Sequence, residues 1–139
     1  MATIVGTLQT AISTELNSLA NNVGVLGTEQ DNTSNKWQAA HFEIYFTTGS
    51  NATAGNLVKL YITSALDGTN YDDLSTPANI NAAQLAGAVV CRAATTHRLK
   101  LFDVPLPVGQ KWKLVFRNES GVALGTSGNT VKYLPYKVQ

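Results

Sequence analysis

Few side chains of this sequence are of the types that carry acid–base or metal chemistry: there are two histidines, one cysteine and nine acidic residues. His41 and Glu43 alternate in a predicted strand, so both face the same side and could share a metal ion. A zinc site needs several ligands that converge on it. An exposed polar strand face is therefore the simpler interpretation of this pair.

Catalytic arrangements find equally little support. No segment resembles the Gly-x-Ser-x-Gly turn that carries the nucleophile of many hydrolases. Asp72 and Asp73 are adjacent, so in a strand their carboxylates point to opposite faces and make a poor pair for glycoside hydrolysis. We expect no enzymatic activity, no catalytic residues and no cofactor.

The densest polar segment spans residues 67–73. Its oxygen-bearing side chains, of the kind that suit calcium, are Asp67, Asn70, Asp72 and Asp73. Their order does not match an EF-hand loop, and the run Asp-Gly-Thr-Asn is typical of a tight turn. The sequence favours a structural turn here and leaves calcium binding as an alternative.

Two surface arrangements are candidates for binding. A row of basic side chains, suited to phosphate or an acidic partner, consists of Lys111, Lys113 and Arg117, with Lys132 beside them. It lacks the interleaved aromatic residues on which single-stranded nucleic acids stack, so we expect no nucleic-acid partner. Tyr45 and Tyr61 could form a platform for a sugar, although tyrosines on sheets commonly pack across strands.

The composition predicts a single folded domain. The chain has 139 residues, of which 44% are hydrophobic and only 14% are charged, with a net charge of +1; charged residues make up about 25% of typical soluble domains. Residues 1–80 hold seven acidic and two basic residues, whereas residues 81–139 hold two acidic and eight basic ones. Opposite poles of this kind can steer neighbouring copies together, whereas interleaving of the two halves in one sandwich would cancel them in space.

The single cysteine and the N-terminal residues indicate the cellular compartment in which the protein is made. Cys91 lies in an apolar run, where a buried and inert thiol is expected, and no disulfide can form within the chain. The N-terminus lacks the pattern of a secretory signal, and no stretch approaches eighteen apolar residues. We expect synthesis in a reducing cytoplasm and no membrane partner.

From Trp37 onward, apolar and polar residues alternate with the period of strands that bury one face. Strands are predicted at about residues 40–46, 58–63, 86–92, 97–102, 111–117, 122–126 and 130–138. Two prolines make residues 103–109 a crossing between sheets at an edge. Seven or eight short strands predict an all-β fold, an antiparallel β-sandwich of jelly-roll or Greek-key type, over residues 36–139.

Residues 1–35 are predicted to form an N-terminal arm and linker. Thr7 is suited to cap a short helix that extends to about residue 21. The apolar residues Leu8, Ile12, Leu16 and Leu19 recur at steps of four, four and three, which gives one narrow stripe. Burial of four aliphatic side chains does not offset the cost of ordering an isolated helix of this length. We therefore expect the stripe to lie on another surface; its own sandwich, a sister subunit and another protein stay open, and these four residues are the predicted partner contacts.

A set of short phrases occurs in a characteristic order along residues 14–139. They are residues 14–20 (TELNSLA), 58–61 (VKLY), 64–71 (SALDGTNY), 92–96 (RAATT), 104–107 (VPLP), 127–130 (SGNT) and 135–136 (PY). In this order the chain resembles a family of small proteins encoded among the structural genes of tailed bacteriophages. The resemblance implies a virion component, particularly a capsid decoration or cement subunit with a β-sandwich body and no catalytic residues.

The function expected from this resemblance is structural. A cement protein binds the exterior of the capsid and stabilises the shell by bridging its subunits, so the expected partners are the major capsid protein and sister copies. A homotrimer would suit threefold positions on a shell. Two alternatives stay open: a tail, fibre or neck component of a phage virion, and a carbohydrate-binding adhesin module. If the arm is separate from the body, deletion of residues 1–30 should leave a folded body that no longer binds capsids.

Overall fold

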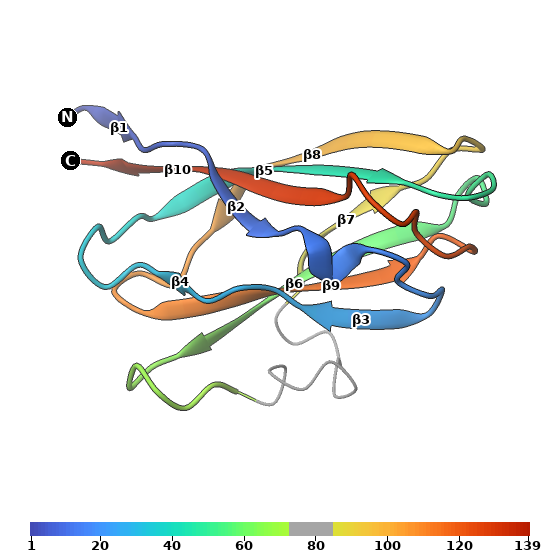
Figure 1. Ribbon diagram of the computed structural model, residues 1–139. Coiled ribbons are helices and arrows are strands. Elements are labelled where there is room, and N and C mark those ends of the chain that lie inside the picture. The colour runs from blue at the N-terminus through green and yellow to red at the C-terminus, as the bar shows by residue number, and fades with distance from the viewer. Residues whose placement is uncertain (73–84) are drawn as a thin grey trace.

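The computed structural model describes residues 1–72 and 85–139, which contain ten β-strands and one short 3₁₀ helix (Figure 1). The strands are β1 (Thr3–Val5), β2 (Gln9–Ile12), β3 (Val23–Leu26), β4 (Gln30–Asp31), β5 (Ala39–Thr47), β6 (Leu57–Ala65), β7 (Leu85–Val90), β8 (Thr96–Pro105), β9 (Lys111–Glu119) and β10 (Thr130–Val138). The 3₁₀ helix η1 spans Thr14–Leu16. Within the described residues, no helix has the length and hydrophobicity needed to cross a membrane.

The strands form two antiparallel sheets of five strands each, which confirms the predicted β-sandwich. In sheet A, β1 and β2 both pair with the same side of β10, followed by β5 and then β8. In sheet B, β3 and β4 pair with the same side of β9, followed by β6 and then β7. The acidic first half of the chain therefore interleaves with the basic second half, and ion pairs such as Arg98–Glu43 join the two.

The core lies between the sheets and contains the residues that the alternation assigned to it. Phe42, Ile44 and Phe46 of β5 face Trp112 and Phe116 of β9, and all five are at most 1% exposed. Large aromatic and aliphatic side chains on one face of each strand supply most of the hydrophobic stabilisation of such a fold. Cys91 is buried as expected.

For the sandwich body, one prediction from the sequence is confirmed and another is wrong. The predicted crossing at residues 103–109 is confirmed, because Pro105 ends β8 at an edge of sheet A and the chain then enters β9 of sheet B. The predicted strand at residues 122–126 is wrong, because this segment contributes only an isolated bridge between Leu124 and Thr48. The predicted loop at residues 75–81 lies outside the described residues.

The predicted helix over residues 7–21 is also wrong. This segment forms β2 and the single turn η1, and Ser18 ends the turn with a positive φ of 60°. Threonine, serine and asparagine are weak helix formers because their side chains compete for backbone hydrogen bonds. Residues 9–12 instead pair as a strand with β10, on the side of β10 that faces away from β5. This pairing within the folded protein overrides the weak local preference for a helix.

The structure builds residues 1–35 into both sheets of the sandwich. Strands β1 and β2 complete sheet A, and β3 and β4 complete sheet B. Between them, the backbone carbonyl of Leu19 accepts hydrogen bonds from the backbone N–H of Leu124 at 2.9 Å and from the buried side-chain amide of Asn118 at 3.0 Å. Removal of residues 1–30 would therefore strip an edge from each sheet, rather than detach a separate arm.

Candidate functional site

The residues singled out as metal ligands do not assemble into a metal site. His41 lies beside Asp103 of β8, whereas Glu43 accepts a 2.6 Å hydrogen bond from Arg98. Among the described residues, no group of three histidine, cysteine or acidic side chains is placed to hold a metal ion. The His41–Glu43 pair is thus split between two different neighbours.

The turn predicted at Asp67 is present. Its carboxylate accepts hydrogen bonds from the backbone N–H groups of Thr69 and Asn70, at 2.9 and 2.7 Å, and from the Asn70 amide at 2.7 Å. These bonds lower the pKa of Asp67 to about 2. Its oxygens are therefore used to close the turn; Asp73, the last member of the calcium alternative, lies outside the described residues.

The basic row does not form one strip. Lys132 lies in β10 of sheet A, whereas the other three side chains lie in β9 of sheet B. On sheet B these cations are already paired: Lys111 with Glu29 at 3.7 Å, Arg117 with Glu119 at 3.3 Å, and Lys113 over the Tyr71 ring at 4.5 Å. The arrangement is that of an ordinary charged sheet face.

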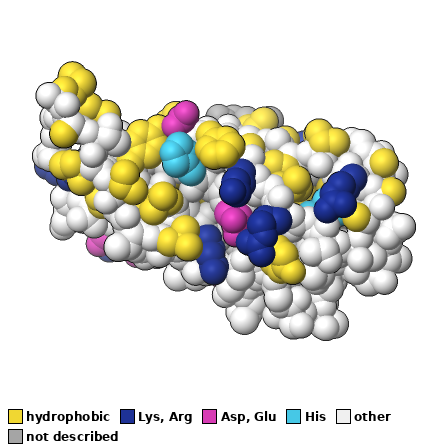
Figure 2. Space-filling view, turned by 90° about the horizontal axis from the view of Figure 1, so that it is seen from above, with side chains coloured by type: hydrophobic (Ala, Val, Ile, Leu, Met, Phe, Trp, Pro, Cys, Tyr) yellow, Lys and Arg dark blue, Asp and Glu magenta, His cyan; other side chains and the backbone are white. Residues whose placement is uncertain are grey.

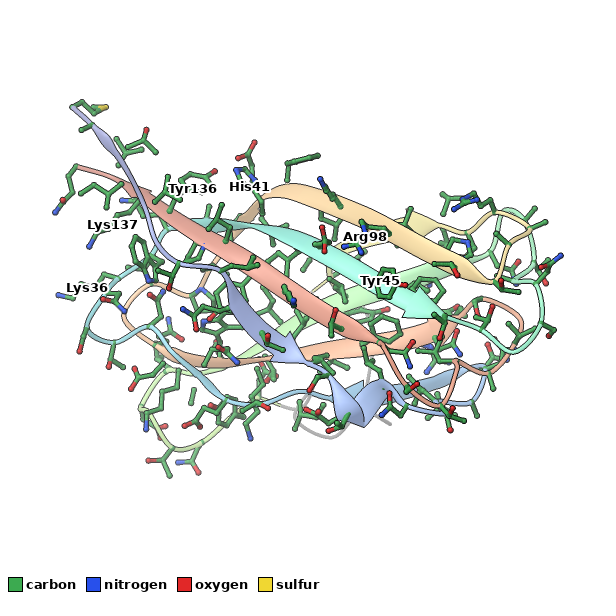
Figure 3. The ribbon with its side chains drawn as sticks, turned by 45° about the horizontal axis from the view of Figure 1, so that its top comes forward. Lys36, His41, Tyr45, Arg98, Tyr136 and Lys137 are labelled. Atoms are coloured by element: carbon green, nitrogen blue, oxygen red, sulfur yellow. The ribbon has the colours of Figure 1, made fainter. Side chains whose placement is uncertain are left out.

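The tyrosine platform is wrong as well. Tyr61 is only 4% exposed and lies in sheet B, whereas Tyr45 lies in sheet A. The Arg98 guanidinium covers the Tyr45 ring, 4.5 Å from its centroid, as Figure 3 shows for the labelled pair. Because the two rings lie in different sheets, they do not form one platform.

The four residues predicted to contact a partner divide into two groups. Ile12, Leu16 and Leu19 are at most 8% exposed and belong to the protein's own core, while Leu8 is 58% exposed. The 3.6-residue stripe that suggested a helix face thus reflects strand β2 and turn η1 packing inward. Of the four, Leu8 is the one that the structure leaves at the surface.

A β-bulge at the end of β8 creates the most distinctive surface feature. Ala40 is opposite Val104 and Phe42 is opposite Leu101, so the single residue His41 is opposite both Phe102 and Asp103. The extra residue, Asp103, has a φ of 55°, a left-handed conformation that aspartate tolerates better than most residues. The bulge turns two consecutive side chains outward, where Phe102 is 66% exposed and the Asp103 side chain is 70% exposed.

His41, Phe102, Asp103 and Tyr136 form what we call the bulge cluster. The His41 ring contacts Phe102 edge to face, with centroids 5.4 Å apart, and Tyr136 at 5.2 Å. The Tyr136 hydroxyl donates a 2.6 Å hydrogen bond to Asp103, and this bond is the main cause that raises the pKa of Tyr136. Figure 3 shows His41 and Tyr136 pointing outward from neighbouring strands of sheet A.

A shallow hollow of about 280 Å³ adjoins the cluster. Its lining consists of Thr3, Val5, His41, Asp103, Leu134 and Tyr136. Figure 2 views this face of sheet A and shows hydrophobic side chains gathered at the end near the chain termini, whereas the other half carries lysine and arginine mixed with further hydrophobic side chains.

Residues 1–5 and 136–139 form a second feature, which we call the terminal ribbon. Ala2 and Gln139 exchange two backbone hydrogen bonds of 2.7 and 3.0 Å, and Gly6 donates a 2.8 Å bond to Pro135. Because hydrogen-bonded pairs alternate in an antiparallel ladder, the backbone groups of Thr3 and Val5 face away from β10. In Figures 1 and 3 the ribbon extends beyond the sheet at the end that carries both termini.

The sequence contained one signal for the bulge cluster that the strand predictions missed. Leu99 and Leu101 follow the inward alternation of β8, but the next buried residue is Val104. A spacing of three instead of two marks an inserted residue, and therefore a place where two neighbouring side chains reach the same face.

Comparisons with known proteins support the fold alone. No known protein family and no curated protein sequence matches the chain. Part of latent PorU from Porphyromonas gingivalis superposes with a TM-score of 0.51 at 9% identity, over 97% of this chain and 13% of that one. The CBM36-1 domain of a xylanase from the hindgut metagenome of Trinervitermes trinervoides gives 0.49 at 10% identity, over 99% and 98% of the two chains. The infectious bursal disease virus Gx strain structure gives 0.48 at 14% identity, over 96% of this chain and 32% of that one.

Proposed function

We propose that this protein is a structural subunit of a tailed-phage virion, a decoration or cement protein that binds the capsid exterior. The observation that carries the proposal is the terminal ribbon, which offers apolar side chains and a free strand edge at one end of a compact sandwich. The resemblance of the sequence to tailed-phage structural proteins supports the same assignment.

The ribbon has the properties of a docking element. Ile4 and Val5, on its two faces, are 37% and 57% exposed, and Val138 beside them is 38% exposed. Unpaired N–H and C=O groups of an edge strand form a template on which another chain can add a strand. A two-stranded ribbon is only marginally stable in water, so a partner that covers it adds stability to both.

The free edge of β1 is unprotected, in contrast to the opposite edge of sheet A. Strand β8 carries Arg98, Lys100, the bulge at Asp103 and Pro105, all devices that discourage edge-to-edge pairing. Strand β1 reads Thr-Ile-Val and has none of them. We propose that β1 pairs with the major capsid protein and that many weak contacts of this kind act together on one shell.

The proposal is tested by adding the purified protein to phage shells that lack it and measuring binding by co-sedimentation and electron microscopy. The informative variant is Val5→Pro, which removes an outward N–H and leaves the bonds of Ala2 and Gly6 to β10 intact. We expect binding at least about tenfold weaker, because each lost hydrogen bond contributes about 1 kcal/mol and the proline ring obstructs the added strand. Val5→Thr retains the N–H and the β-branched shape, and should bind like the unmodified protein.

Three results would contradict this function. The first is that the unmodified protein does not bind shells. The second is that Val5→Pro binds shells as well as Val5→Thr does. The third is that the protein decorates tails or necks instead of shells. The third result would favour the alternative position in the virion. Light scattering of the unbound protein tests the proposed homotrimer, which a monomer at all concentrations would exclude.

A further inference from the structure

The aromatic side chains of the bulge cluster present open ring surfaces. Phe102 is 66% exposed, so most of its ring is open to solvent although it contacts His41 edge to face at an interplanar angle of 66°. Tyr136 lies on the other side of His41 at an interplanar angle of 32°. Exposed aromatic rings grouped in this way offer an apolar surface for a flat ligand that has C–H groups on one face.

The cluster also holds a hydrogen-bond donor and an acceptor that are fixed relative to these rings. The backbone N–H of Asp103 donates to His41 Nδ1 at 3.2 Å, so Nδ1 is the acceptor and the proton of the neutral imidazole is on Nε2. The Asp103 carboxylate receives the Tyr136 hydroxyl on Oδ1 at 2.6 Å, and a carboxylate has further acceptor positions on Oδ2. A hydroxyl-rich ligand can therefore receive a bond from His41 and donate one to Asp103.

From this combination we infer that the bulge cluster binds one pyranose unit of a saccharide. A pyranose ring has an apolar C–H face for Phe102 and a rim of hydroxyls that both donate and accept for His41 and Asp103. The adjoining hollow of about 280 Å³, which is lined by His41, Asp103 and Tyr136 but not by Phe102, lies just below the usual range for small-ligand pockets, about 300–1,000 Å³, so it has room for a single ring beside Phe102. Because the site is open on the face of a sheet, neighbouring units of a longer glycan can extend away from it.

An apolar protein segment fits this cluster less well. Such a segment would cover the Asp103 carboxylate, 70% exposed, without giving it a new partner. Burial of a polar or charged group without a hydrogen bond is costly, whereas a sugar hydroxyl replaces the water that is lost. The left-handed backbone of Asp103 orients this carboxylate outward beside the rings, which supports a polar ligand.

The experiment is an NMR titration of the isotope-labelled full chain with glucose, galactose, mannose, xylose and N-acetylglucosamine. Each is added to about 100 mM, which detects dissociation constants in the millimolar range. A glycan array of bacterial surface polysaccharides then identifies tighter ligands. We expect at least one sugar to shift the amide signals of residues 41, 102, 103 and 136. Phe102→Ala should weaken that binding at least about tenfold.

Tyr45→Ala is the matched control, because it removes another aromatic ring from β5 that lies under Arg98 and outside the cluster. It should bind the sugar like the unmodified protein, and thermal melting establishes that both variants are folded. The inference is overturned if no sugar shifts the cluster, or if Phe102→Ala and Tyr45→Ala bind equally.

Shell binding separates this inference from the proposed function. Phe102→Ala should bind shells normally, because Phe102 lies in β8, at the edge of sheet A opposite to β1. Loss of shell binding in Phe102→Ala, without any sugar bound, would make the cluster a protein-docking face and overturn the saccharide site while leaving the proposed function in place.

Discussion

Replacement of Leu16 by alanine tests whether the first residues of the chain belong to the folded core. Leu16 is 0% exposed in turn η1 and packs with the buried residues between the two sheets. Leu8 precedes it in the same segment, but it is 58% exposed. The same substitution at these two positions therefore removes the same atoms from a buried and from an exposed environment.

The expected difference is large. A buried leucine replaced by alanine loses its transfer free energy and leaves a cavity, which together cost about 2–5 kcal/mol of unfolding free energy. An exposed leucine replaced by alanine usually changes stability by no more than about 0.5 kcal/mol. For a domain of this size, each kcal/mol lowers the melting temperature by roughly 3–5 °C, so Leu16→Ala should melt at least about 6 °C below the unmodified protein.

Thermal melting by circular dichroism, with urea unfolding to obtain the free energy, measures both variants. Leu8→Ala should melt within about 2 °C of the unmodified protein. If Leu16→Ala lowers the free energy of unfolding by less than about 1 kcal/mol, the packing described above is refuted and the N-terminal segment is a separate arm. Equal losses in both variants would refute it too, because the exposed position has no cavity to create.

Two further predictions concern the core. Burial lowers the pKa of His97 below its usual 6.5, and its Nδ1 has no hydrogen-bond partner among the described residues. As the pH falls, the unfolded chain therefore takes up the His97 proton before the folded protein does, so the free energy of unfolding should decrease below about pH 6.5. In urea unfolding, His97→Gln should lose less of this free energy between pH 7 and 5 than the unmodified protein does. Gly27→Ala should destabilise by about 1–3 kcal/mol in the same assay, because the added Cβ would lie 2.6 Å from the Ala11 carbonyl oxygen. Gly49→Ala, with nothing within 4 Å, should cost far less, and equal losses for the two glycines would contradict the close approach of Gly27 to Ala11.

The body of the sandwich could be predicted because its strands bury one face. Phe42, Ile44 and Phe46 alternate with exposed or half-buried residues, and the same rhythm in β9 places Trp112, Leu114 and Phe116 in the core. A slip of one residue would expose all of these side chains, so the pattern is strongly constrained. Long strands with a single buried face are the elements that a sequence specifies best.

The N-terminal segment could not be predicted in the same way. Its strands are two to four residues long, too short to show a period of two, and they depend on partners 80 or more residues away. The steps between Ile12, Leu16 and Leu19 also fit a helix, and only the open side of β10 decides between the two forms. The local spacing of apolar residues fitted both a helix and a strand, and pairing with the distant strand β10 determined which of them formed.

The bulge cluster combines residues from three strands and could be recognised only in part. The spacing from Leu101 to Val104 indicates an insertion in β8, but nothing local indicates that His41 and Tyr136 lie beside it. That neighbourhood depends on the order β10–β5–β8 within sheet A. The pairing register between strands that are distant in the chain cannot be predicted from a single sequence.

The position of β10 in sheet A has a consequence for how the protein is made. This strand is translated after all the other described strands, yet it lies between β5 and the strands β1 and β2. Until it emerges, one side of β5 has no partner and the hydrophobic face of the sheet is incomplete. Nascent chains should therefore stay incompletely folded and prone to aggregate until β10 has emerged, and they should need chaperones during that interval.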